Sequence, residues 1–325
     1  MRIVVTGGAG FIGSHFVRQA IKGNYSAFAD AELVVLDKLT YAGNKQNLAE
    51  VADSSRLRFV EGDICDGRLV GETLRGADAV VHFAAESHVD RSIAGADEFV
   101  RTNVLGTQTL LNAATEHGVG KFVHVSTDEV YGSLESDDAP WTEEEALKPN
   151  SPYSASKASS DLLALAAHRT HGLPVCVTRG SNTYGHHQYP EKIIPLFVTN
   201  LLDGLKIPLY GDGENVRDWL HVDDHCQGIA LVAADGKPGE VYNVGGGIEL
   251  TNRQVTGRLL TLLNMDESMV RYVADRKGHD RRYAMDISKI SGQLGYQPTV
   301  TWEKGLAETI DWYTAHRDWW EPLKG

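Results

Sequence analysis

The sequence predicts an α/β fold in which a doubly wound parallel sheet is joined to a smaller mixed α/β domain. Strand patterns alternate with helix patterns from residue 2 to residue 179, and a glycine-rich turn links the first strand to the first helix. The chain has 325 residues, which is long enough for one large domain and a smaller one. Ligands of such sheets bind at the carboxyl ends of the strands, so functional residues are expected there.

Composition and charge restrict the class of protein. Apolar content of 42% and charged content of 23% are ordinary for a globular protein, and the net charge of −13 disfavours a nucleic-acid partner. Cys65, Cys176 and Cys226 are odd in number and lack C-x-x-C spacing, and no His/Asp/Glu cluster has metal-binding spacing. No secretory leader or membrane-spanning apolar run is visible. We therefore expect a cytoplasmic protein with no metal, no membrane and no nucleic acid among its partners.

The first strand and helix, residues 2–6 and 11–22, are joined by a turn that contains Gly7, Gly10 and Gly13. Glycines at this spacing permit a tight turn, close approach to a pyrophosphate and close packing of helix on strand, as in a Rossmann dinucleotide site. The pattern is weak alone, but Asp37 ends the second strand, where an acid bonds the ribose hydroxyls and repels a 2′-phosphate. The sequence thus predicts NAD rather than NADP.

Further strands are expected at residues 57–61, 79–83, 121–126 and 173–179. The pattern then becomes irregular, with a short extended segment at 206–210, a strand at 241–244 and a closing helix at 302–316. Because the chain returns to the first domain, we predict two discontinuous domains. They comprise residues 1–185 with 218–247, which bind the cofactor, and residues 186–217 with 248–325, which bind the substrate.

The stretch from Lys121 to Lys157 carries the candidate chemistry. Its strand ends in a hydroxyl and two carboxylates, and a helix that Asn150 or Ser151 can cap then places a phenol and an amine four residues apart on one face. The candidate catalytic residues are Thr127, Asp128, Glu129, Tyr153 and Lys157. Tyr153 and Lys157 could be an ordinary exposed pair on a helix, and Asp128 and Glu129 could belong to a solvated turn. Both motifs occur together after a glycine fingerprint, however, and this combination favours acid–base catalysis on a small molecule. The acidic loop at 134–149 is expected to be a solvated surface loop.

These motifs resemble those of a known family. Gly7-x-x-Gly10-x-x-Gly13, Tyr153-x-x-x-Lys157 and the loop around Asn182 resemble extended short-chain dehydrogenases/reductases that act on nucleotide sugars. Thr127-Asp128-Glu129 is similar to the same triplet of dTDP-glucose 4,6-dehydratases, as are the stretches at 39–43, 86–92 and 275–280. Related 4-epimerases usually lack the two carboxylates. A dehydratase or 4-epimerase acting on a UDP- or GDP-sugar is the alternative, and a non-catalytic NAD-binding regulator is a third interpretation.

The resemblance implies conversion of dTDP-glucose to dTDP-4-keto-6-deoxyglucose. Tyr153, whose phenolate Lys157 stabilises, would take the proton of the 4-hydroxyl while carbon 4 is oxidised by NAD. Glu129 would then remove the carbon 5 proton and Asp128 would protonate the departing 6-hydroxyl, with Thr127 bonded to the 4-oxygen. Hydride would return from NADH to carbon 6, so that NAD stays tightly bound and is recycled within each turnover.

The resemblance also assigns binding residues and an assembly. The cofactor residues are Gly7, Gly10, Phe11, Ile12, Gly13, Asp37, Lys38, Leu39, Thr40, Asp63, Ile64, Phe83, Ala84, Ala85, Ser87, Thr102, Tyr153, Lys157 and Thr183. The substrate residues are Ser87, Thr127, Asn182, Glu191, Lys192, Pro208, Leu209, Tyr210, Arg217, Asn252, Arg276 and His279. A homodimer built from helices near 97–117 and 153–171 is expected. Arg281, Arg282 and Tyr283 are expected at the surface or at the dimer contact.

One loop departs from the family pattern. Relatives commonly read Arg-Cys-Ser-Asn-Asn-Tyr-Gly-Pro, whereas this chain has Thr183 in place of the second asparagine and His186 in place of the proline. Threonine still bonds but reaches less far than asparagine. The departure bears on the preference for sugar or nucleotide rather than on the type of reaction.

Overall fold

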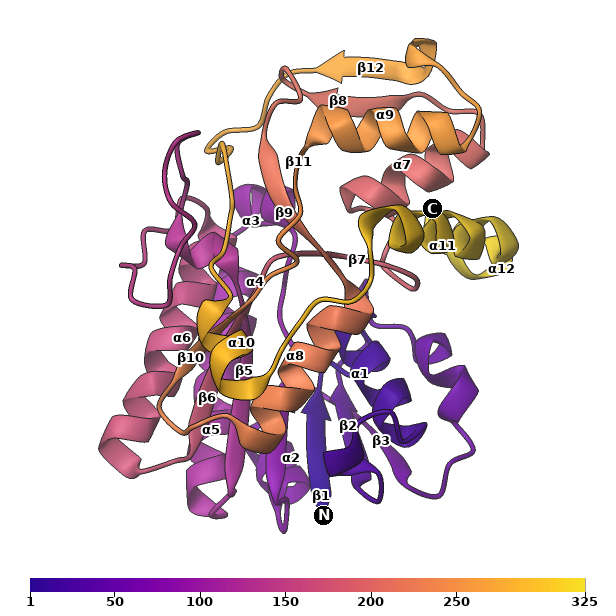
Figure 1. The fold of residues 1–325 in the computed structure, drawn as a ribbon. Coiled ribbons are helices and arrows are strands. Elements are labelled where there is room, and N and C mark those ends of the chain that lie inside the picture. Colours follow the sequence, from indigo (N-terminus) through magenta and orange to yellow (C-terminus); the bar gives the residue numbers. More distant parts are fainter. Residues whose placement is uncertain (325) are drawn as a thin grey trace.

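A computed structural model describes residues 1–324 as two lobes, with the larger one at the bottom of Figure 1. The larger lobe is built on a seven-stranded sheet in the order β10-β6-β5-β4-β1-β2-β3, and every neighbouring pair is parallel. Its strands are β1 Arg2–Thr6, β2 Glu32–Asp37, β3 Leu57–Glu61, β4 Ala79–His82, β5 Lys121–Thr127, β6 Val175–Gly180 and β10 Val241–Val244. The predicted doubly wound parallel sheet is confirmed.

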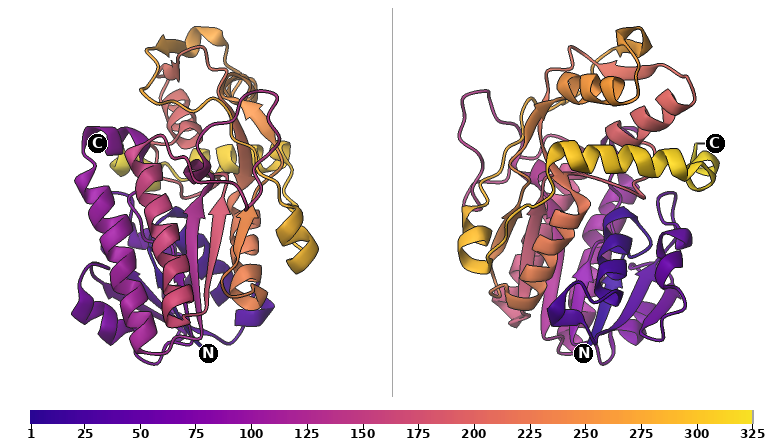
Figure 2. Two further views of the ribbon diagram at one scale, coloured as in Figure 1. Left: turned by 90° about the vertical axis from the view of Figure 1, so that its left-hand side faces the viewer. Right: turned by 45° about the vertical axis from the view of Figure 1, so that its right-hand side comes forward.

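Helices cover both faces of this sheet (Figure 2). The flanking helices are α1 Phe11–Ile21, α2 Gly67–Leu74, α5 Thr107–Glu116, α6 Pro152–His171, α8 Val222–Asp235 and α10 Ser288–Leu294. Apolar residues of α1, α8 and α10 form one core, and those of α2, α5 and α6 form the core on the other face. Except for the edge strand β3, in which no residue is buried, the strands are largely buried and mainly apolar, as expected for a parallel sheet.

Helix α6 has strong local start and stop signals. Ser151 is the N-cap and forms a capping box with Ser154, Pro152 occupies the first turn, and Gly172 ends the helix in the left-handed region at φ +72°. Of the two predicted caps, Ser151 is therefore the one used. Asn150 instead donates its side-chain amide to Asp280 Oδ1 at 2.6 Å. The start of the helix is thus fixed both locally and by a distant segment.

The smaller lobe contains two short sheets and a separate apolar core. A three-stranded sheet has the order β11-β9-β7, and a two-stranded parallel sheet pairs β12 with β8. Its elements are β7 Asn182–Tyr184, α7 Ile193–Leu202, β8 Ile207–Tyr210, β9 Val216–His221, β11 Glu249–Thr251, α9 Asn252–Leu262, β12 Val270–Val273, α11 Trp302–Ala315 and α12 Arg317–Trp320. Tyr184, Trp219, Trp302 and Trp320 lie in its core. This lobe is the mixed α/β unit that the sequence predicts.

The loop at 134–149 is not a fully solvated one. Leu134 and Trp141 are each 6% exposed, and their backbone N–H groups donate to Arg282 O at 3.0 Å and Ala284 O at 2.9 Å. The prediction of a solvated loop is wrong at these two positions because their apolar side chains pack with Tyr283 and Met285 in a small core. Across residues 1–324, no helix has both the length and the apolar character needed to span a membrane.

Candidate active site

A cavity of about 970 Å³ lies at the carboxyl ends of the parallel strands and extends into the smaller lobe. Its lining contains every predicted catalytic, cofactor and substrate residue except Leu39. Leu39 adopts a left-handed φ of +55°, and its N–H donates to Asp37 Oδ1 at 2.8 Å. It therefore orients the carboxylate that the sequence assigns to the ribose, without facing the cavity itself.

The turn between β1 and α1 forms a cradle without side chains. Gly7 has φ +68°, and a Cβ added there would lie 2.6 Å from Ala84 N. A Cβ on Gly13 would collide with the carbonyl oxygen of Gly7. The N-cap of α1, Gly10, forms no side-chain cap, so the first N–H groups of the helix stay free. Glycine is thus required here, and the free N–H groups suit the pyrophosphate of a dinucleotide.

Two acidic residues complete the cofactor half of the cavity. Asp37, 8% exposed, accepts N–H bonds from Leu39 and from Ala9, the latter at 2.9 Å. Burial raises the pKa of this carboxyl, and the two backbone bonds oppose the rise. Asp63 follows β3 and pairs with Lys38 Nζ at 2.9 Å. With the glycine cradle, these residues fit NAD.

The catalytic candidates converge at the end of β5 and the start of α6. Thr127 accepts the N–H of Glu129 through its side-chain oxygen at 3.2 Å and donates its hydroxyl to Asp128 Oδ1 at 3.2 Å. Asp128 is 2% exposed, and its Oδ2 has no hydrogen-bond partner within residues 1–324. Tyr153 and Lys157 are 8% and 4% exposed on the facing helix. The residues that the spacing predicts to meet do line one cavity.

The two carboxyl groups have different surroundings. Burial, then the charges of Glu129 and Asp218, raise the pKa of Asp128 well above its usual value, while Arg217 acts in the opposite direction. Burial also raises the pKa of Glu129, but three cations, Lys192, Arg217 and Arg276, oppose that rise. Asp128 is therefore the carboxyl group more disposed to hold a proton, and Glu129 is the one whose ionised form nearby cations favour. This arrangement suits a general acid and a general base at one substrate.

Tyr153 and Lys157 are a deeply buried pair. Burial and the Glu129 charge raise the pKa of the Tyr153 phenol well above its ordinary value, although a hydrogen bond with Thr127 opposes the rise. Burial lowers the pKa of Lys157 to about 8, and the charge of Asp161 opposes that change. Lys157 Nζ donates to Val125 O at 2.8 Å, which fixes it under the strand. The phenol thus needs extra positive charge beside it before it can act as a base.

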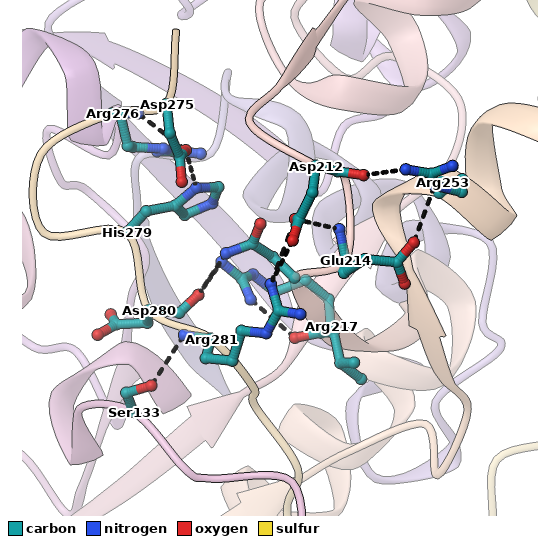
Figure 3. A network of polar contacts seen from close by, with 12 residues as sticks. Ser133, Asp212, Glu214, Arg217, Arg253, Asp275, Arg276, His279, Asp280 and Arg281 are labelled. Carbon is teal, nitrogen blue, oxygen red and sulfur yellow. Dashed lines mark hydrogen bonds and ion pairs between the residues drawn. The ribbon is translucent and has the colours of Figure 1, made fainter. Parts of the chain in front are cut away.

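Three of the predicted substrate residues, Arg217, Arg276 and His279, lie close together in one polar network that borders the cavity (Figure 3). Arg217 donates to Asp280 O at 3.0 Å and lies over the ring of Tyr283 at 4.1 Å. His279 shares its Nδ1 with Asp275 Oδ1 at 2.6 Å. Among the predicted substrate residues, three buried polar atoms have no hydrogen-bond partner within residues 1–324, namely Asn182 Oδ1, Arg276 Nε and His279 Nε2. Buried donors and acceptors that lack a protein partner favour a polar ligand that forms hydrogen bonds with them.

Two residues of this half were not predicted. Tyr283 was expected at the surface or at a dimer contact, but it is 4% exposed and lines the cavity, so that expectation is wrong. The residue is buried because its hydroxyl finds an acceptor, Asp280 Oδ2 at 2.6 Å, and its ring receives Arg217. Asp280 itself joins Asn150, Arg217 and Tyr283, and so connects the catalytic helix with strand β9.

Comparison with known proteins agrees with this geometry. The sequence profile of the GDP-mannose 4,6 dehydratase family matches residues 4–309. A dTDP-glucose 4,6-dehydratase of Streptomyces antibioticus is 62% identical over 325 residues, covering 100% of this chain and 96% of that protein. The crystal structure of a dTDP-glucose 4,6-dehydratase from Streptomyces venezuelae, with NAD and dTDP bound, is 64% identical, with a TM-score of 0.98 over 99% of this chain and 100% of that one. This chain belongs to the dTDP-glucose 4,6-dehydratase family.

The dehydratase family lies within the extended short-chain dehydrogenases/reductases, whose other branches share the fold. A UDP-glucose 4-epimerase of Thermotoga maritima, solved with UDP-glucose, is 32% identical, with a TM-score of 0.88 over 97% of this chain and 99% of that one. Fold alone therefore does not separate dehydratase from epimerase. Two observations favour the dehydratases over the epimerases, namely the higher sequence identity and the Asp128–Glu129 pair.

The two departures from the dehydratase pattern have structural partners. The Thr183 hydroxyl bonds His225 Nδ1 at 2.7 Å and Ser181 O at 3.1 Å, while the residue lines the cavity. The ring of His186 lies 5.3 Å from the ring of His15 and 6.1 Å from that of Trp312. The Thr183 hydroxyl is thus engaged by helix α8, and His186 packs among aromatic rings between the two lobes.

Proposed function

We propose that the protein dehydrates dTDP-glucose to dTDP-4-keto-6-deoxyglucose. NAD, when bound in the glycine cradle, supplies the hydride acceptor for oxidation at carbon 4 and the donor for reduction at carbon 6. Tyr153 takes the proton of the 4-hydroxyl, and Lys157 stabilises the phenolate. Thr127 bonds the 4-oxygen, Glu129 removes the carbon 5 proton, and Asp128 protonates the departing 6-hydroxyl. A proton returns to carbon 5 when carbon 6 receives its hydride. Because carbon 6 is reduced in the same site, NAD stays tightly bound and is recycled within each turnover.

This proposal depends on the different surroundings of the Asp128 and Glu129 carboxyl groups. Asp128 is buried with one oxygen unpartnered and its pKa raised, as a proton donor requires. Burial raises the pKa of Glu129, but the charges of Lys192, Arg217 and Arg276 oppose that rise, which favours its use as a proton acceptor. An epimerase, which moves no proton at carbons 5 and 6, needs neither group.

The test is to incubate purified protein, without added NAD, with dTDP-glucose and then with UDP-glucose, and to analyse the product by mass and NMR. Loss of one water from dTDP-glucose is expected. Inversion at carbon 4 without a mass change would instead identify an epimerase, and reaction of UDP-glucose alone would change the assigned nucleotide.

The Glu129→Gln variant tests the assignment of the base. We expect it to block elimination while NAD stays bound and oxidation at carbon 4 is partly retained, since the glutamine amide cannot take the carbon 5 proton. Glu144→Gln removes an exposed carboxylate of the 134–149 loop and is the matched control. Product formation by Glu129→Gln at the wild-type rate would contradict the assignment.

The binding residues are part of the same proposal. The residues around the glycine cradle, with Asp37 and Asp63, hold NAD, and the unpartnered atoms of Asn182, Arg276 and His279 support a diphosphate and sugar site beside them. Residues 208–210, which line the cavity from β8, are proposed to contact the base. Isothermal titration of the Arg276→Met variant with dTDP, which has the diphosphate but no glucose, tests this placement, and weaker binding than by the wild type is expected.

We propose that residues 1–185 with 218–247 form the NAD-binding domain and that residues 186–217 with 248–325 form the nucleotide-sugar domain. The separate apolar cores of the two lobes support the division, but Ile290 and Tyr296 pack into a core of the larger lobe, and Tyr184 and Trp219 pack into that of the smaller lobe. Limited proteolysis, with the fragments identified by mass, tests where the boundary after residue 247 falls.

We also propose a cytoplasmic homodimer. Val100, Leu105 and Leu162 are 54%, 55% and 60% exposed on neighbouring helical segments, which is the apolar surface expected for a contact between copies. Light scattering should give a dimer mass for the wild type and a monomer mass for Leu105→Glu. Leu262→Glu, at an exposed leucine of α9, should remain dimeric. Activity that sediments with membranes during cell fractionation would contradict the cytoplasmic location.

A further inference from the structure

Three side chains from separate segments meet beside the cofactor half of the cavity. Tyr41 follows strand β2, Arg91 lies on helix α3 Val89–Ala94, and Glu191 lies just before helix α7. Tyr41 donates its hydroxyl to Glu191 Oε1 at 2.9 Å, and Arg91 Nε donates to Glu191 Oε2 at 3.1 Å. The Arg91 guanidinium also lies 3.7 Å from the centre of the Tyr41 ring. We call these three residues the clasp.

The clasp forms a wall between the cavity and solvent. Arg91 and Glu191 both line the cavity, yet 48% of the Arg91 side chain and 14% of the Glu191 side chain are exposed to solvent. Arg91 therefore lies at the rim of the cavity, where the exposed part of its side chain meets solvent. Breaking the clasp therefore opens the cavity at this point.

The segment that carries Glu191 is fastened to both loops of the cofactor half. Lys192 Nζ donates to Ser87 O at 2.8 Å in the loop after β4, and the Tyr189 ring meets the Tyr41 ring edge-on at 5.3 Å in the loop after β2. The residues flanking both loops, Thr40, Gly43 and Ala85, line the same cavity. Residues 189–192 thus bridge the two loops between which the cofactor half of the cavity lies.

The clasp bonds are of the strong, charge-assisted kind. Each oxygen of the Glu191 carboxylate receives one donor, and the arginine gains a cation–π contact in addition. Burial and the Glu191 charge raise the pKa of the Tyr41 phenol, which therefore stays a neutral donor. Moving the 189–192 segment away from both the loop after β2 and helix α3 breaks both bonds.

We propose that the clasp retains NAD in the enzyme between turnovers by closing the cofactor half of the cavity. This rests on the proposed function, because only a reaction that returns the hydride to its own substrate lets an enzyme keep one cofactor molecule. A dehydrogenase that releases its reduced cofactor after every turnover needs an open path for the cofactor. In this protein the clasp lies at that position.

The experiment measures release of labelled NAD from the purified holoenzyme, in the absence of sugar, after addition of excess unlabelled NAD. Tyr41→Phe removes one hydroxyl, and Arg91→Met removes the charged donor and the ring contact. Each is expected to accelerate release about tenfold, the equivalent of roughly 1.4 kcal/mol. Lys45→Met is the matched control, because Lys45 pairs with Glu61 at 2.8 Å and lies 4.8 Å over Phe59 but is exposed.

Release at the wild-type rate in both clasp variants, with unchanged melting temperatures, overturns the proposal. Equal acceleration in Lys45→Met also overturns it, since the effect would then follow from any ion pair of this lobe. If Arg91→Met does not fold, Tyr41→Phe decides, because it removes a single oxygen. A failure of the proposed function is seen separately, as a wild-type protein that converts no dTDP-glucose.

Discussion

Two polar networks of similar composition lie on opposite sides of the active site, and they differ in burial. Beneath strand β5, Arg179 pairs with Asp161 at 2.9 Å and donates to Tyr131 at 2.9 Å, with 0% of Asp161 and 3% of Arg179 exposed. Around the substrate half (Figure 3), Arg253 pairs with Glu214 at 2.8 Å and Arg281 with Asp212 at 3.3 Å, and these side chains are 39–59% exposed.

The difference separates stability from ligand binding. Asp161 lies one helical turn after Lys157, and its partner Arg179 belongs to β6, so the buried network holds the catalytic helix on the sheet. Removing one partner would leave a charge in the protein interior. The exposed network shapes a loop that carries cations to the cavity, and solvent screens its individual pairs.

Breaking the buried network should have the largest effect. Asp161→Asn leaves the Arg179 guanidinium buried without a counter-charge, so we expect the free energy of unfolding to fall by about 3–5 kcal/mol. Urea denaturation measures this change. Asp53→Asn, at an exposed position, is the control, and a loss in Asp161→Asn no larger than in the control would show that the pair contributes nothing.

Arg217 is the buried member of the substrate half, and it should affect binding more than stability. Arg217→Lys loses the bond to Asp280 O and the contact with the Tyr283 ring, because an ammonium lacks the planar fork. We expect the KM for dTDP-glucose to rise roughly 10- to 100-fold, as for loss of one charged hydrogen bond. Steady-state kinetics measure this rise. An unchanged KM would exclude Arg217 from substrate binding.

The pH dependence of activity should report on the buried network alone. If Lys157 must be charged, activity falls as pH rises through its pKa of about 8. The Asp161 charge raises that pKa, so Asp161→Asn should move the alkaline fall to lower pH. Asp212→Asn, in the exposed network, should leave the profile in place. Profiles of kcat measured below the melting temperature of each variant distinguish these outcomes.

The smallest effect is expected in the exposed network. Arg253→Met removes the pair with Glu214, in which the two side chains are 50% and 39% exposed. After allowance for solvent screening, the free energy of unfolding should change by no more than about 0.5 kcal/mol. A loss as large as that of Asp161→Asn would mean that burial does not separate the two networks.

The fold could be predicted from the sequence where the signals are local. Alternating strands and helices, the glycine turn and the four-residue spacing of Tyr153 and Lys157 each depend on neighbouring residues, and the strands of the large sheet form as predicted. Residues at the carboxyl ends of parallel strands necessarily meet at one edge of the sheet. This is why nearly all the predicted site residues line one cavity.

Contacts between distant segments could not be predicted in the same way. Tyr283 follows two arginines, a pattern typical of a surface, and its burial depends on Asp280 and on Arg217 from another strand. The Arg179–Asp161 pair and the clasp join residues 18 to 150 positions apart. Trp141 is the exception, because an aromatic residue inside an acidic run was a visible signal that part of the loop is anchored.

The order of the strands has a consequence for synthesis on the ribosome. Phe16 and Val17 of α1 pack in the same core as Ile229 and Val232 of α8, and the edge strand β10 follows still later. The apolar face of α1 therefore stays uncovered until α8 has been synthesised, which takes roughly 10–40 seconds at ordinary elongation rates. During that interval the nascent chain exposes an apolar surface that can aggregate. The protein therefore depends more on chaperones during synthesis than a protein whose strands are added to the sheet in sequence order.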